Sequence, residues 1–251
     1  MTRHLTPVIL PLLSVTLLIL VIEALNRAGM LPVFIPGPLQ IGLVAWNNPR
    51  LVIGNLLPTM YTATMGYVIA VALTFTAACI GVLVRRLRGS IYSTGVVINA
   101  IPVIATAPLL ALWLGTGGST QIVIAALSTQ FPLLVGAMQG LATADERQRE
   151  LLYVLNASRV QVVWYLRIPT ALPYIFAGLK VAAPLAVLGA ITAEWAGADR
   201  GVGAMMLYAL FSYDIEKVWL AVLLCCGLAG SAYALLALLE RQVVTWERTR
   251  T

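Results

Sequence analysis

The sequence predicts an all-α, polytopic membrane protein with about six transmembrane helices. Hydrophobic residues make up 60% of the 251 residues, and the mean hydropathy is +0.91. Only 10% of the residues are charged, whereas a soluble domain carries about a quarter. The apolar residues also form separate segments of the roughly 20 residues that a membrane helix needs. We therefore treat residues 1–251 as a single transmembrane domain.

The first expected span is longer than the roughly 7–15 apolar residues of a secretory signal, so we expect it to be retained as a helix. Residues 51–60 are either an interfacial helix or part of the second span, and the core spans fill about 61–240. A charge-free stretch from Gly89 to Ala144 is long enough for two spans joined by a glycine-rich turn. The expected spans are 5–25, 61–84, 90–114, 120–141, 170–193 and 218–239.

The distribution of Lys and Arg predicts that both termini lie in the cytoplasm, since inner segments of membrane proteins are enriched in these residues. With this orientation the inner segments hold Arg3, Arg85, Arg86, Arg88, Arg147, Arg149, Arg159, Arg167, Arg241, Arg248 and Arg250. The outer segments hold only Arg27, Arg50, Arg200 and Lys217. Because the net charge of +6 is spread among apolar runs, it indicates topology and not binding to nucleic acid. Lys180, inside a span, either snorkels to the inner surface or lines an inner vestibule.

Residues 143–169 interrupt the apolar pattern with two predicted amphipathic helices. Thr143 and Glu146 have the spacing of a capping box, which predicts a helix over about 144–155. Asn156 is the best non-glycine residue for a left-handed helix stop. Ser158 begins a second helix through a capping box with Gln161, and we expect Pro169 to end that helix.

The first of these helices carries Leu151, Leu152 and Leu155 on one face, while Glu150 lies off it. We expect the apolar face to pack on the membrane domain and the charged face to meet a soluble partner. An interfacial helix lying on lipid is the alternative.

The stretch from Glu150 to Pro169 resembles the EAA loop of ABC importer permeases. Glu150 stands at the Glu position of that pattern, Asn156 at its Gly position and Pro169 at its closing Pro. Leu151 and Leu152 depart from the two alanines of the pattern, and Asn156 departs from its glycine. Because Leu151 and Leu152 replace small alanines, the sequence leaves open how this helix fits the groove of the partner. Asn156 is still able to form the bend.

Three further segments are similar, in the same order, to the nitrate/sulfonate/taurine branch of these permeases. They are LPVFIPGPLQIG at 31–42, IPVIATAPLLALWLGTGG at 101–118 and ITAEWAGADRGVGAMML at 191–207. The resemblance implies the fold of a type I ABC importer permease in the bacterial inner membrane. It also implies a second permease copy, a cytoplasmic ABC ATPase dimer that binds ATP and Mg, and an extracytoplasmic substrate-binding protein. The APLL at 107–110 is closer to relatives that move thiamine precursors, riboflavin or aromatic acids.

The candidate functional residues form two groups. The resemblance assigns contact with the ATPase to Glu150, Leu151, Leu152, Leu155, Asn156, Ala157, Ser158 and Arg159. The candidate translocation pathway consists of polar, aromatic and sulfur-containing residues in or beside the spans: Glu194, Trp195, Trp113, Thr106, Gln130 and Met138. Glu194 is the sharpest of these, because ionisable residues at membrane depth face a cavity or a partner. The alternative is that Glu194 pairs with Arg200 at the membrane surface.

The sequence argues against catalysis by this chain. The only histidine is His4, which excludes a His-based triad or a His-rich metal site. No GxxxxGK[ST] phosphate loop is present, so ATP hydrolysis would belong to another chain. An ATP-independent secondary transporter or channel is the main alternative, supported by the proline-broken spans and by Glu194 as an ion site. A membrane scaffold that moves no solute is a third.

Overall fold

The computed structural model describes residues 6–143 and 146–246, and this part of the chain is helical without strands. The N-terminal helices are α1 (Thr6–Arg27), α2 (Pro38–Asn47), α3 (Pro49–Leu83), α4 (Arg85–Ala100) and α5 (Val103–Leu114). The remaining elements are α6 (Gly118–Ala142), α7 (Glu146–Val154), α8 (Arg159–Val162), the π-helix η1 (Val163–Arg167), α9 (Ile168–Glu194), α10 (Val202–Phe211) and α11 (Ile215–Val243). The predicted all-α class is confirmed for these residues.

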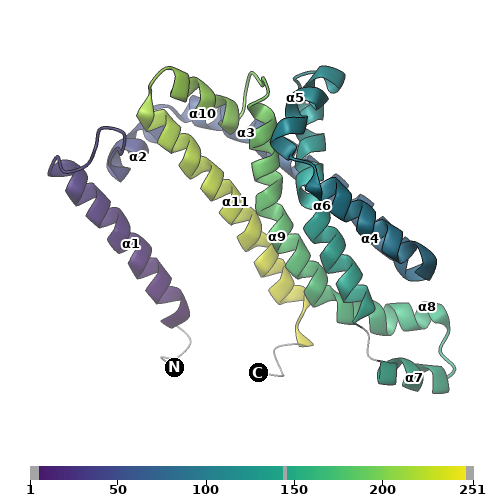
Figure 1. The fold of residues 1–251 in the computed structure, drawn as a ribbon. Coiled ribbons are helices and arrows are strands. Elements are labelled where there is room, and N and C mark those ends of the chain that lie inside the picture. The colour runs from purple at the N-terminus through teal and green to yellow at the C-terminus, as the bar shows by residue number, and fades with distance from the viewer. Residues whose placement is uncertain (1–5, 144–145, 247–251) are drawn as a thin grey trace.

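Within the described residues, four stretches are long and apolar enough to cross a membrane: α3, α6, η1 with α9, and α11. The pair α4 and α5 makes a fifth if it counts as one bent span. These stretches correspond to the second to sixth expected spans. The first expected span corresponds to α1, a 22-residue helix that stands apart from the bundle in Figure 1 and is tied to α2 through Glu23, which accepts from the Leu39 amide.

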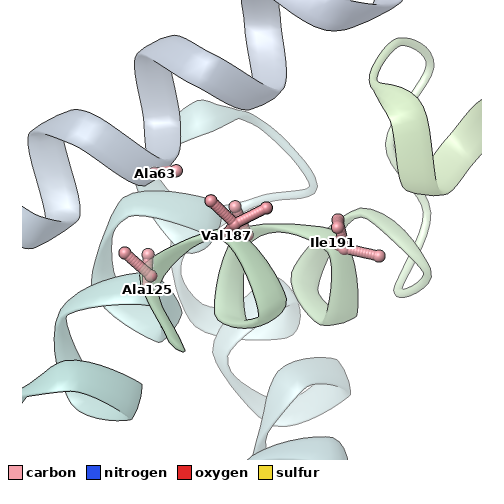
Figure 2. Packing of buried hydrophobic residues seen from close by; sticks show 6 residues of the cluster. Ala63, Ala125, Val187 and Ile191 are labelled. Carbon is pink, nitrogen blue, oxygen red and sulfur yellow. The ribbon is translucent and has the colours of Figure 1, made fainter. Parts of the chain in front are cut away.

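The bundle is built around small residues that let α3, α6 and α9 approach closely. A Cβ at Gly136 of α6 would lie 2.7 Å from the Tyr174 carbonyl oxygen of α9, and one at Gly140 would lie 2.8 Å from that of Ala171. The glycine pair therefore serves the close packing of α6 on α9. Figure 2 shows a second such contact, where Ala63, Ala125, Val187 and Ile191 gather between the three helices.

Prolines act differently from one helix to another. Residues 51–60 belong to the second span, because α3 runs unbroken for 35 residues with Pro58 inside it. The expected span over 90–114 is sharply bent at Pro102, since α4 and α5 meet at an angle of 90°. Ile101, the residue before Pro102, is extended at φ −72° and ψ 123°, as the proline ring disfavours the helical conformation there.

The expected helix end at Pro169 is wrong, since the chain continues from α8 through η1 into α9. The amide of Ile168 donates to the carbonyl of Val163, five residues back. This wider turn brings Pro169 into the first turn of α9, a position that proline tolerates.

The bundle has two distinct ends (Figure 1). At one end lie α7 and α8 with the adjoining ends of α6 and α9 and the C-terminal end of α11. At the other end lie α2, α5, α10 and the connection between α9 and α10. The first end carries the predicted partner surface, and the second carries Glu194.

Candidate functional site

The bend between α7 and α8 is a Schellman motif centred on Asn156. Asn156 has a left-handed backbone, with φ at 59°. Its amide donates to the Tyr153 carbonyl at 2.9 Å, and the next amide, of Ala157, donates to the Leu152 carbonyl at 2.9 Å. These two bonds satisfy carbonyls that the end of a helix leaves free. The predicted left-handed stop at Asn156 is confirmed.

The start of α8 is the predicted capping box. The Ser158 amide donates to Gln161 Oε1 at 2.7 Å, and the Gln161 amide donates to Ser158 Oγ at 3.3 Å. The box predicted from Thr143 is less simple, because the Thr143 hydroxyl donates back to the Gln139 carbonyl at the end of α6. Residues 144–145, which join Thr143 to α7, lie outside the described part of the chain.

The apolar face of α7 does not pack on the membrane domain, which corrects our expectation. Leu151 is 61% exposed and Leu155 is 67% exposed, while Leu152 is half-buried. This nine-residue helix projects beyond the ends of α6 and α9 (Figure 1), so no other element of the described residues covers Leu151 and Leu155. Glu150 and Asn156 are exposed on the same projection. The side chain of Arg159 is outside the described residues, although α8 begins at this position.

Other exposed apolar side chains extend this surface, although the sequence analysis did not assign them to it. They are Tyr153, Val154, Trp164 and Tyr165. The sequence does show aromatic and β-branched residues on both sides of the bend, but we assigned the apolar face from the leucines alone. We call the exposed residues Leu151, Tyr153, Val154, Leu155, Trp164 and Tyr165 the hinge surface.

Two of the predicted pathway residues meet at a cavity of about 440 Å³ between α4, α5, α6 and α9. Thr106 and Trp113 of α5 line it. Neutral polar groups share the lining with them: Asn99, Ser128 and Thr192. No charged residue contributes to this lining in the described part of the chain.

The remaining pathway candidates do not join this cavity. Gln130 lines a separate, mostly apolar cavity of about 540 Å³ between α3, α4 and α6, and donates to the Gly95 carbonyl at 3.2 Å. Met138 is 4% exposed and packs in the core with Leu134 and Ala171. Trp195 is half exposed at the C-terminal end of α9.

Glu194 is buried, at 1% exposure, and lies at the junction of α3, α9 and α10. Its Oε1 accepts from the Thr59 hydroxyl at 2.6 Å, and its Oε2 accepts from the Gly203 amide at 2.7 Å. The amide belongs to the first turn of α10, where a carboxylate also interacts favourably with the helix dipole. The bonded partners of Glu194 are thus groups of the protein interior and not Arg200.

Comparison with known proteins gives the family. The model of the binding-protein-dependent transport system inner membrane component matches residues 74–245. The chain belongs to this family of transport permeases. It is a transport component rather than an enzyme.

Two similar permeases align over almost their full lengths. The formylaminopyrimidine transport permease ThiX of Halalkalibacterium halodurans is 28% identical over 95% of this chain and 96% of its own. The riboflavin transport system permease RibX of Chloroflexus aurantiacus is 28% identical over 94% of this chain and 90% of its own. Permeases named for aliphatic sulfonates and for taurine match as well. The predicted branch of ABC permeases is confirmed.

A solved amino acid ABC transporter has a similar fold, with a TM-score of 0.64 and 17% identity. The match covers 80% of this permease and 97% of the solved chain. It supports the predicted type I permease fold.

An ion pair in the permease went unpredicted. Lys180 Nζ lies 2.5 Å from Glu240 Oε2, which ties α9 to the last turns of α11. Glu240 is 60 residues away in the sequence, so no local sequence pattern predicts the pair. The charge of Lys180 is therefore balanced by a carboxylate within the permease.

Among the described residues, no group of His, Cys, Asp or Glu is arranged to hold a metal ion.

Proposed function

We propose that this permease is one of two copies that form the translocation pathway of an ATP-driven importer in the bacterial inner membrane. The end that carries α7 and α8 faces the cytoplasm, and a cytoplasmic ABC ATPase dimer, with its own ATP and Mg, docks there. An extracytoplasmic binding protein delivers the solute at the opposite end. The excess of Lys and Arg in the segments of the α7 and α8 end supports this orientation.

The proposal that the ATPase docks at this end rests on the exposed hinge surface. Six large apolar side chains are exposed on a short projection that is fixed by the Schellman motif and the capping box. Exposed apolar patches of this kind mark contacts with another protein. The left-handed Asn156 and the Ser158 box give the two helices a defined angle, so force on α7 passes through α8 and η1 into α9.

Co-purification with the ATPase tests this role. We expect Leu155→Asp, Glu150→Lys and Asn156→Pro each to reduce recovery of the ATPase, because they remove an apolar contact, reverse a charge or break the bend. Val243→Asp is the control, since Val243 is also exposed at the end of α11 but lies outside the hinge surface. Equal recovery with all four variants would remove the docking role.

The lining of the 440 Å³ cavity favours a solute without a strong charge. Its lining offers the amide of Asn99, the hydroxyls of Thr106, Ser128 and Thr192, and the ring of Trp113. A planar, polar heterocycle suits such a mixture of hydrogen-bonding groups and an aromatic face. The cation of Lys180, a charge of the sign that attracts a sulfonate, is already paired with Glu240.

We therefore propose a small neutral heterocyclic compound as the solute, of the class that includes riboflavin and aminopyrimidines. ATP-loaded proteoliposomes containing the permease, ATPase and binding protein would be offered riboflavin, a formylaminopyrimidine and taurine. We expect uptake of a heterocycle and none of taurine. Uptake of taurine alone would contradict the assignment of solute class while leaving the ATPase role standing.

A further inference from the structure

We propose that Asn55, Thr59 and Glu194 are positioning residues that fix the first turn of α10 against α3 and thereby shape a cavity at the end of the bundle opposite α7 and α8. Together with Gly201 and Gly203 we call them the Glu194 clasp. The inference concerns the fold of this end and does not depend on the solute or on ATPase docking. That this end is the loading face rests on the proposed function.

The hydrogen bonds of the Glu194 clasp run in one connected chain. The Thr59 hydroxyl donates to Glu194 and accepts from the Val202 amide at 2.8 Å. One turn earlier on α3, Asn55 Oδ1 accepts from the Gly201 amide at 3.1 Å. With the bond from Gly203 to Glu194, three successive amides at the start of α10 are held by side chains of α3 and α9. These are among the amides that a helix start leaves without partners in its own backbone.

The two glycines make room for the carboxylate. Gly201 has a φ of +136°, and a Cβ there would overlap the Glu194 carboxyl group. A Cβ at Gly203 would lie 2.8 Å from the Ile191 carbonyl oxygen. Thr59 and Glu194 are also almost fully buried, at 0% and 1% exposure. The GVG turn and Glu194 therefore fit one another, and neither serves as an open binding group.

The Glu194 clasp borders a cavity of about 600 Å³. Asn55 belongs both to the clasp and to the cavity wall. The residue before Gly201 is Arg200, which lines the cavity with Arg50 of α3, Asp199, Tyr208 and Lys217. Fixing the amide of Gly201 to Asn55 thus sets the position of Arg200 relative to Arg50. Release of the clasp would let the 195–201 segment and α10 move away from α3.

The clasp requires a side chain at position 194 that hydrogen-bonds both Thr59 and Gly203, and it does not require an ionisable group. In Glu194→Gln, the amide oxygen is still able to accept from Gly203, and the amide nitrogen is able to donate to Thr59 Oγ1. The Thr59 hydroxyl then has the Asn55 carbonyl as its acceptor, which already lies at 3.2 Å. We therefore expect the Gln variant to keep the clasp, whereas a proton or ion site would lose its function.

Hydrogen exchange of the full-length permease in nanodiscs tests the proposal. We expect Thr59→Val and Glu194→Ala to speed exchange of the amides over 201–205 by about tenfold or more, the effect of losing buried hydrogen bonds. Thr62→Val is the matched control. Thr62 is 3% exposed on the same helix, but its hydroxyl donates only to the Pro58 and Thr59 carbonyls of that helix.

Distances between spin labels at Arg50→Cys and Ser212→Cys, with the native cysteines replaced, report the cavity itself. We expect a narrow distribution in the parent, Thr62→Val, Glu194→Gln and the conservative Thr59→Ser, and a broad one in Thr59→Val and Glu194→Ala. If Thr59→Val and Glu194→Ala match Thr62→Val in both measurements, the positioning role is overturned. If Glu194→Gln behaves as Glu194→Ala does, the claim that hydrogen bonding without an ionisable group suffices is overturned. Neither measurement involves the ATPase or a solute, so failure here is separate from failure of the proposed function.

Discussion

Asn156 adopts a backbone conformation that glycine adopts freely and other residues adopt at a cost. With φ at 59°, we expect Asn156→Gly to keep the bend and Asn156→Ala to weaken it by about 1 kcal/mol. Alanine has the Cβ that disfavours this conformation but lacks the short polar side chain that eases it in asparagine. Exchange of the Ala157 amide, which donates across the bend, measures the effect. Equal exchange in the Gly and Ala variants would contradict the role given to the left-handed backbone.

Gly136 carries the close contact of α6 with α9. We expect Gly136→Ala to lower the free energy of unfolding by roughly 1–3 kcal/mol, since the new methyl group meets the Tyr174 carbonyl of the facing helix. Gly227 of α11 has nothing within 4 Å of the added Cβ. Thermal melting in detergent should therefore show Gly227→Ala unchanged or slightly more stable. A Gly136→Ala variant as stable as Gly227→Ala would show that the helices separate without cost.

Local residue patterns were readable from the sequence, whereas distant partners were not. Asn156 and the Ser158 box depend on neighbours within a few residues, so the capping rules sufficed. The partners of Glu194 and Lys180 are Thr59 and Glu240, 135 and 60 residues away. The depth of Glu194 in the expected span therefore suggested a pathway role, and only the packing of α3 against α10 reveals its hydrogen bonds.

At the scale of elements, the start of α11 gives a pH-dependent prediction. Asp214 caps this helix by accepting from the Lys217 amide at 3.1 Å. A hydrogen bond from the Lys217 side chain holds the pKa of Asp214 below its usual value of 3.8. The charged carboxylate thus stabilises the fold above the usual pKa, and this contribution is lost as the pH falls through the lowered pKa.

We expect Asp214→Asn to retain the cap but to lose this acid dependence, and Asp214→Ala to cost about 0.5–2 kcal/mol at neutral pH. Melting temperatures between pH 7 and pH 3 would check both. An Asn variant that still loses the same stability in acid would assign the effect to another group.

The prolines show why element boundaries were harder to predict than elements. Pro58 and Pro132 lie inside long, uninterrupted helices, and Pro102 accompanies a 90° break. Pro169 lies in the first turn of α9, although we expected it to end the preceding helix. The local rule is the same at each site, namely a missing N–H and a restricted preceding residue. The outcome depends on which neighbours satisfy the freed carbonyl, such as the π-turn of η1 before Pro169, and this is a property of the packed bundle.

At the scale of the whole molecule, the order of spans followed from hydropathy, but the cavities did not. Thr106 and Trp113 come together with Asn99 only because α5 folds back at Pro102 over α6 and α9. Met138, which had seemed equally suited from its position on α6, instead fills the core. The faces of a helix in an apolar bundle differ little in composition, so periodicity alone does not tell a cavity wall from a core.

This difference predicts which positions a solute meets. In a variant without native cysteines, we expect Thr106→Cys to react with a small, water-soluble thiol reagent, because Thr106 lines the 440 Å³ cavity. Met138→Cys should react at least about tenfold more slowly, since its side chain is 4% exposed in the core. If the cavity belongs to the pathway, modification at Thr106→Cys also blocks ATP-driven uptake, and the transported solute slows the reaction. Equal reactivity at both positions would contradict the cavity, whereas reaction at Thr106→Cys without loss of uptake would separate the cavity from transport.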